Sequence, residues 1–172
     1  LPDVRLLAVL RNPVDRAQSA LVHHMKHKRV PKDSDLLAVV RRMPPGADPL
    51  GIISGGWYAA SLRPYMRRFG ERLLVLLHDD VKADPAAVYK AATAHIGADV
   101  GFLPEELTEV MFSNQGGSDA SPPSRSQRMK RASALDQEVR AELYRYFRRD
   151  LLQLERLIDR DLSMWAPDGA DA

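Results

Sequence analysis

Hydrophobic residues are arranged along this chain in two ways. The segment Leu6–Leu10 and residues 72–77 are short, continuous apolar runs, which are typical of strands covered on both faces of a parallel sheet. Elsewhere, apolar residues return every three or four positions, which indicates helices. Each run is followed by a helix start, so we expect an α/β layered fold with a parallel sheet.

Capping residues set the bounds of most predicted helices. Asn12-Pro13 begins a helix that extends from Val14 to about residue 28, because asparagine caps helices and proline suits their first position. A short helix is expected to start near residues 33–35, before a turn-rich loop that reaches Leu50. Asp84-Pro85 repeats the cap-plus-proline start, and Gly97 ends that helix.

The segment 54–69 also has helical spacing and stops at Gly70. Pro64 is expected to kink it or to begin a new helix. Trp57 and Tyr58 are interpreted mainly as core residues, with a binding surface as the alternative. The pair Gly55-Gly56 permits a close approach of the backbone to another group, such as a nucleotide or an acceptor.

The longest helical pattern covers residues 136–162 and is expected to pack across the sheet. One face of it is apolar: Val139, Leu143, Phe147, Leu151, Leu154 and Ile158. Within it, Arg148-Arg149-Asp150 is interpreted as exposed surface. We assign residues 1–165 to one domain and 166–172 to a disordered tail.

Composition narrows the class of protein. The 172 residues are 45% apolar and 28% charged, which is ordinary for a globular domain long enough to bury a core. The sequence contains no cysteine, which excludes disulfides, thiolate metal sites and a cysteine nucleophile. A net charge of +2 does not by itself indicate nucleic-acid binding, and no apolar run is long enough to span a membrane. The chain begins at Leu1 and enters a strand almost at once, which suggests a fragment.

The junction after the first strand has the chemistry of an anion site. Arg11 lies where the strand meets a helix N-terminus, whose free N–H groups and dipole favour a negative charge. Ser19 is predicted on the same helical face as Asn12, two turns further on. This combination predicts a phosphate-binding strand–turn–helix. The alternative is that Arg11 merely ends the strand and Ser19 is an ordinary surface residue.

The residues of this junction resemble a known motif. Arg11-Asn12-Pro13, with Arg16 and Ser19, resembles the 3′-phosphate-binding motif of the sulfotransferases that use 3′-phosphoadenosine 5′-phosphosulfate (PAPS). In that family the arginine and the serine contact the 3′-phosphate, so the resemblance implies this role for Arg11 and Ser19. The resemblance is closer to the carbohydrate-type and bacterial branches of the family. It continues through the following segments: Gly56-Trp57-Tyr58, Leu62, Tyr65, residues 69–76, Asp79-Asp80 and Asp84-Pro85.

The resemblance also implies a fold and a second group of binding residues. The fold would be a P-loop-NTPase-like parallel sheet flanked by helices in three layers, and mostly helical in this portion. The basic segment 124–131 is similar to the family's loop over the 3′-phosphate, which places Arg128 and Lys130 in contact with the cofactor. Met129 stands where the family has glycine. A solvated basic turn is the alternative for this segment.

The resemblance implies transfer of a sulfuryl group from PAPS to a hydroxyl or amine of a small molecule, lipid or carbohydrate acceptor, without a metal. The Gly-rich loop for the 5′-phosphosulfate, its lysine and the general base are expected upstream, because no such loop occurs in these residues. The catalytic residues and the oligomeric state are therefore left unassigned. The alanine and arginine content suggests a GC-rich bacterial genome and a cytoplasmic enzyme.

Parts of the sequence are also compatible with other functions. A non-catalytic nucleotide- or anion-binding module would use the same junction. A P-loop kinase fragment would need magnesium-binding acids, for which Asp79 and Asp80 are the candidates; we favour structural hydrogen bonding for both. His23 and His27 share a helical face but lack a third metal ligand. Nucleic-acid binding by the basic segment is disfavoured, since no aromatic residues interleave with its charges.

Overall fold

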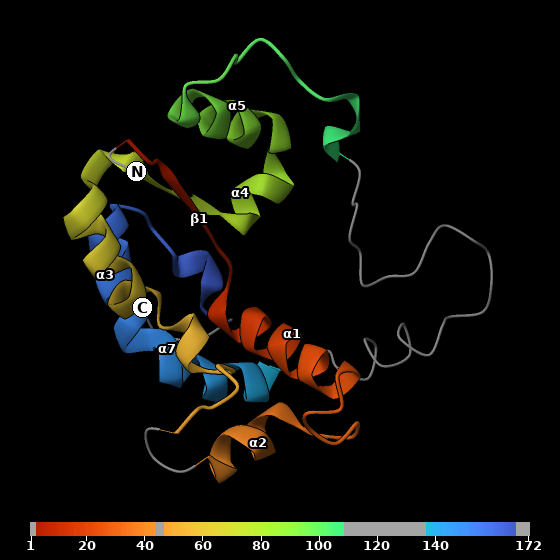
Figure 1. The fold of residues 1–172 in the computed structure, drawn as a ribbon. Helices are drawn as coiled ribbons and strands as arrows, with labels where there is room; N and C mark the ends of the chain where they lie inside the picture. Colours follow the sequence, from red (N-terminus) through yellow and green to blue (C-terminus); the bar gives the residue numbers. More distant parts are fainter. Residues whose placement is uncertain (1–2, 44–46, 109–136, 168–172) are drawn as a thin grey trace.

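A computed structural model describes residues 3–43, 47–108 and 137–167 (Figure 1). Strands β1 (Leu6–Leu10) and β2 (Leu73–Leu77) pair in parallel, with Leu6 opposite Leu73 and Leu10 opposite Leu77. This confirms both predicted strands and their parallel pairing. The described residues form a helix-rich fold with a two-stranded sheet. The three-layer, P-loop-NTPase-like arrangement stays a prediction.

The helices follow the predicted order, and their caps explain where they begin. Asn12, Asp35 and Asp84 each accept a hydrogen bond from a first-turn N–H group through the side chain, and Gly97 ends its helix with a φ of 77°. The helices are α1 (Pro13–Lys26), α2 (Leu36–Arg42), α3 (Tyr58–Phe69), α4 (His78–Ala83), α5 (Pro85–Ile96) and α7 (Gln137–Ile158), with 3-10 turns η1 (Ser54–Gly56), η2 (Gly70–Arg72), η3 (Glu105–Thr108) and η4 (Ser163–Trp165).

Helix α3 differs from its prediction. It begins at Tyr58 after the η1 turn and passes through Pro64 as one helix. Of the two alternatives at Pro64, the new helix start is therefore wrong, and the kink stays a prediction. Its first turn is capped from α7, because the Asp150 carboxylate accepts hydrogen bonds from the N–H groups of Ala59 and Ala60 at 2.9 and 3.1 Å. Asp150 is therefore half-buried and structural, where the sequence suggested exposed surface.

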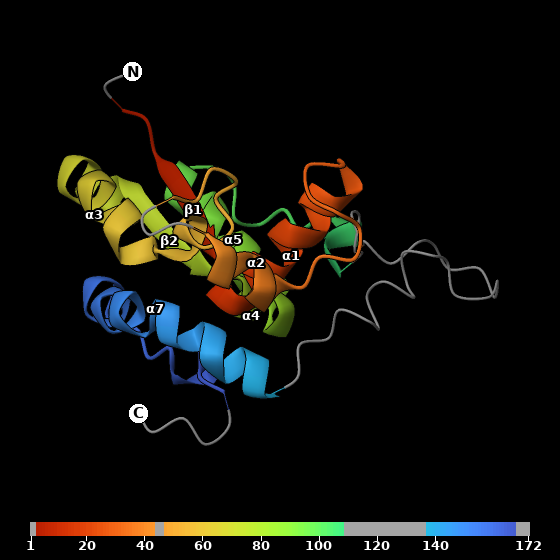
Figure 2. The same ribbon diagram turned by 90° about the horizontal axis from the view of Figure 1, so that it is seen from below.

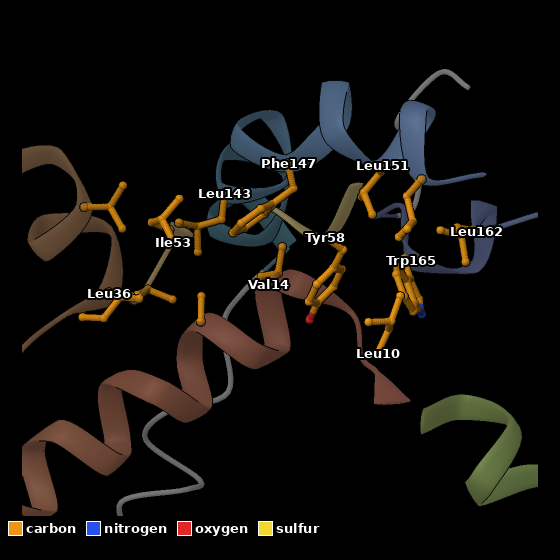
Figure 3. Close-up of a cluster of buried hydrophobic side chains, with 14 of the residues drawn as sticks. Leu10, Val14, Leu36, Ile53, Tyr58, Leu143, Phe147, Leu151, Leu162 and Trp165 are labelled. Carbon is orange, nitrogen blue, oxygen red and sulfur yellow. The ribbon is translucent and has the colours of Figure 1, made fainter. Parts of the chain in front are cut away.

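The core lies where α1, α3 and α7 meet the ends of the strands. Helices α3 and α7 pack side by side, and α7 also contacts α1 (Figures 1 and 2). The predicted apolar face of α7 is confirmed, since Leu143, Phe147, Leu151 and Leu154 are buried. Figure 3 shows Phe147 and Leu143 from α7 facing Val14 of α1. This packing fixes the position of α1 and of the junction before it.

The two strands are tied together at their amino ends by a histidine from α5. The Nε2 atom of His95 lies 3.1 Å from the carbonyl oxygens of both Leu6 and Arg72. A carbonyl oxygen can only accept, so Nε2 carries the proton and is shared between the two. Thus α5 joins the starts of β1 and β2.

One face of β1 is open to solvent among the described residues. Leu7 and Val9 are 45% and 56% exposed, whereas Leu10 is buried. None of the helices that the structure describes is long and apolar enough to cross a membrane.

Candidate functional site

The parallel register places Arg11 next to His78. Leu10 and Leu77 are paired, and each is the last residue of its strand, so Arg11 and His78 leave neighbouring strands at the same edge. This is the carboxyl edge, where open α/β sheets bind ligands. The N-terminus of α1 begins two residues after Arg11. A cationic side chain, an imidazole and a helix N-terminus therefore converge at one place.

Both side chains present polar atoms without partners. Arg11 Nε and His78 Nδ1 are buried and make no hydrogen bond to any residue that the structure describes. Buried polar atoms are normally paired, so each such atom requires an explanation. Burial lowers the pKa of His78, and the positive charges of Lys82 and Arg11 lower it further, against the opposing charges of Asp79 and Asp15. The site thus favours an anion that could satisfy both groups.

The backbone of this junction is held from two sides. The side-chain amide of Asn12 donates a hydrogen bond of 3.1 Å to the Trp165 carbonyl oxygen, besides capping α1. Trp165 in turn donates from its indole Nε1 to Asp79 at 2.8 Å, and Asp80 pairs with Arg160. These contacts agree with the structural role expected for Asp79 and Asp80. In Figure 3, Trp165 lies beside Leu10 and Tyr58.

The structure describes two of the four predicted cofactor-binding residues. Arg11 is at the junction and half-buried, and Ser19 is half-buried on α1, two turns beyond the cap. No contact joins Arg11 to Ser19 within the described chain, so their joint binding role stays a prediction. Arg128 and Lys130 lie outside the described residues.

Arg16 has a structural role instead. Its Nη1 atom donates to the carbonyl oxygens of Gly51 and Ile52 at 2.7 and 3.1 Å. A Cβ atom on Gly55 would overlap the Arg16 guanidinium, and one on Gly56 would lie 2.7 Å from Phe147 Cε1. The close approach predicted at the glycine pair therefore exists, but side chains of this chain fill it rather than a nucleotide or an acceptor.

The loop before η1 is organised by one carboxylate. Asp48 accepts hydrogen bonds from the backbone N–H groups of Ile52, Ile53 and Ser54 at 2.9, 2.8 and 2.6 Å. Burial acts to raise the pKa of Asp48, but these hydrogen bonds favour the charged form and the pKa lies below its ordinary value. Asp48 therefore fixes the loop that Arg16 contacts.

His78 is not among the binding residues predicted from the sequence. A usable signal was present: His78 occupies the same position relative to β2 as Arg11 does to β1. The short helix α4 begins directly at His78.

No group of three metal-ligating side chains gathers within the described ranges. His23 and His27 do meet, with ring centroids 4.4 Å apart.

A comparison with solved structures agrees with the fold described above. The chain is similar to a solved sulfotransferase from Alicyclobacillus acidocaldarius, with a TM-score of 0.71 and 29% sequence identity. The match covers 95% of this chain and 58% of that chain, so this sequence spans somewhat more than half the length of its structural neighbour. No protein-family model matches the chain, and no curated protein matches its sequence. The fold is sulfotransferase-like.

Proposed function

We propose that this chain forms the 3′-phosphate-binding part of a PAPS-dependent sulfotransferase. The observation that carries the proposal is the pair Arg11 and His78 beside the N-terminus of α1. The buried atoms Arg11 Nε and His78 Nδ1 have no hydrogen-bond partner among the described residues. The sulfotransferase-like fold supports it. A nucleotide phosphate would accept hydrogen bonds from the guanidinium. The dipole of α1 would favour its negative charge, although the N–H group of Val14 is already bonded to Asn12 Oδ1.

In the proposed reaction a sulfuryl group passes from PAPS to a hydroxyl or amine of a small-molecule or carbohydrate acceptor. The residues of this chain contribute by positioning the donor, because orientation lowers the barrier of an in-line transfer. Arg11 and His78 would hold the 3′-phosphate. Further predicted contacts are Ser19, two turns along α1, and the two basic residues Arg128 and Lys130. The setting that we propose, a bacterial cytoplasm, rests on composition alone.

Thermal stabilisation by nucleotides tests this proposal. A ligand that binds the folded chain raises its melting temperature, and at equal concentration a tighter ligand raises it more. We expect 3′,5′-adenosine diphosphate to stabilise the protein and 5′-ADP and ATP to do so much less, since they lack the 3′-phosphate. Arg11→Gln should abolish the difference, and Arg67→Gln, an exposed arginine on α3, should keep it. Equal stabilisation by all three nucleotides would contradict the proposal.

A sulfuryl-transfer assay separates the enzyme from a non-catalytic module. Labelled sulfate should move from PAPS to an acceptor when the protein is assayed in its natural full-length form. Selective binding of 3′,5′-adenosine diphosphate without transfer would instead support a nucleotide-binding module.

A further inference from the structure

A hollow of about 370 Å³ lies beyond the C-terminal end of α1. Residues 28–32 line it, and three of these five side chains are cationic: Lys28, Arg29 and Lys32. All three are exposed. The ion pairs found in the described chain involve none of them. The hollow is therefore a shallow, open depression whose three cations form no ion pair with the residues that the structure describes.

The backbone shapes this hollow by a sharp turn. Lys28 has a φ of 56°, its N–H group donates to the Met25 carbonyl oxygen, and the N–H group of Arg29 donates to that of His24. Such a left-handed residue after a helix is usually glycine. Here lysine occupies the strained position, although glycine would adopt this backbone conformation at a lower energetic cost. A charged side chain therefore lies at the rim of the hollow.

Two histidines continue the polar surface along the same face as Ser19. Ser19, His23 and His27 follow one another at four-residue intervals and so share a helical face. The side chain of His23 is exposed. Its pKa lies below its ordinary value, first because of desolvation and then because of the charges of His27, His24, Arg29 and Lys26. Arg29 of the hollow is therefore close enough to His23 to act on it.

The spacing relates the hollow to the proposed donor site. With a rise of about 1.5 Å per residue, His27 lies roughly 12 Å along α1 from Ser19. A molecule in the hollow would thus lie beyond the predicted phosphate contact, on the same helix. Cations near a helix C-terminus also offset its dipole, but that effect needs no concave site.

We propose that the hollow at residues 28–32 binds an anionic group of the acceptor, so that the acceptor is a sugar or small alcohol that bears a carboxylate or a phosphate. This inference rests on the proposed function, because it assigns the acceptor of that reaction. Lys28, Arg29 and Lys32 would hold the anion, and His23 and His27 would line the path toward the donor.

The test is an NMR titration of the ¹⁵N-labelled chain at constant ionic strength. The probes are D-glucuronate, D-glucose 6-phosphate and, as the neutral control, D-glucose. We expect saturable shifts of the amides of residues 28–32 with one or both charged sugars and none with glucose. The same titration should raise the pKa of His23, read from its ring proton. Shifts with glucose alone, or none with any probe, would overturn the inference.

Two double variants distinguish binding at a specific site from a general electrostatic attraction of anions to the protein. Lys28→Gln with Arg29→Gln should weaken binding of the charged sugar at least tenfold, whereas Arg67→Gln with Lys90→Gln removes two exposed charges elsewhere and should leave it unchanged. Equal weakening in both would contradict a specific site. Unchanged dispersion of the remaining amide signals shows that each variant is folded.

The sugar-binding test and the nucleotide-binding test can fail separately. Binding of 3′,5′-adenosine diphosphate without binding of charged sugars refutes this inference alone. Binding of charged sugars in a protein that ignores the nucleotide refutes the proposed function, and with it the assignment of the sugar as acceptor.

Discussion

The hydroxyl group of Tyr58 donates a hydrogen bond of 2.8 Å to the carbonyl oxygen of Arg11. Tyr58 is 9% exposed, and its ring centroid lies 6.4 Å from that of Trp165. Burial raises the pKa of Tyr58, so the phenol stays protonated and remains a donor at neutral pH. One side chain therefore fills the core with its ring and positions the backbone of the candidate phosphate site with its hydroxyl group.

Replacing this hydroxyl group should weaken both the fold and the site. Tyr58→Phe leaves the carbonyl oxygen of Arg11 without its partner, which is expected to cost about 1 kcal/mol of unfolding free energy. It should also reduce the affinity for 3′,5′-adenosine diphosphate. Urea denaturation and calorimetry measure the two effects. Tyr65→Phe, at a residue 53% exposed, is the control and should change neither; equal effects at both positions would refute the structural role.

Arg11 and Arg16 should respond oppositely to the same change. Arg11→Met removes a buried donor that has no partner within the described chain, so the unfolding free energy should stay constant or rise by up to about 1 kcal/mol. Arg16→Met removes hydrogen bonds to two carbonyl oxygens and should lower it by about 1.5–3 kcal/mol. Denaturation without nucleotide is the measurement. A large loss at Arg11 would mean that its role is structural.

We expect His78 to give two opposite pH effects, one on folding stability and one on nucleotide affinity. Its pKa is lower in the folded chain than in the unfolded chain, so its stabilising contribution is present above about 6.5 and is lost as the pH falls through the folded pKa. A bound phosphate would favour the protonated ring, so nucleotide affinity should rise over the same decrease in pH. His78→Gln should remove both dependences. The phosphate's own titration is common to the two proteins, so the difference between them isolates the histidine.

Asp48 predicts sensitivity to acid. Its pKa is depressed in the folded chain, so its contribution is complete above the unfolded pKa of about 4 and is lost as the pH falls through the folded value. Asp48→Asn should lower the unfolding free energy at pH 7 by about 1–2 kcal/mol, because the charged acceptor is replaced by a neutral one. At pH 2 to 3 the difference should shrink. A difference that is constant with pH would contradict this account.

The sequence predicted the features that depend on local chemistry. Asn12, Asp84 and Gly97 act within a few residues of themselves, so their caps were predicted correctly, as was the apolar face of α7. The parallel pairing of the strands was also predicted, but side-chain contacts between distant residues were not. The start of α3 is determined by Asp150, which lies 90 residues away in the sequence. The neighbour of Arg11 depends on strand register, so His78 could be given a role only once β1 and β2 were paired.

The candidate site follows the same division. Arg11 lies where the sequence placed it, at the end of a strand and before a capped helix. Its unpaired nitrogen could not be predicted, because burial depends on Tyr58, Trp165 and the rest of the core. The glycine pair shows the limit of local reasoning, since Gly55 and Gly56 indicated a close approach but not that Arg16 and Phe147 would fill it.

The imidazole of His95 has a mechanical consequence. Because it binds the first carbonyl of β1 and the last residue before β2, the two strands are clasped at the end remote from Arg11 and His78. Pairing continues along both strands to Leu10 and Leu77, so the end that carries Arg11 and His78 is held by the sheet itself. The histidine therefore couples the position of α5 to that of the sheet.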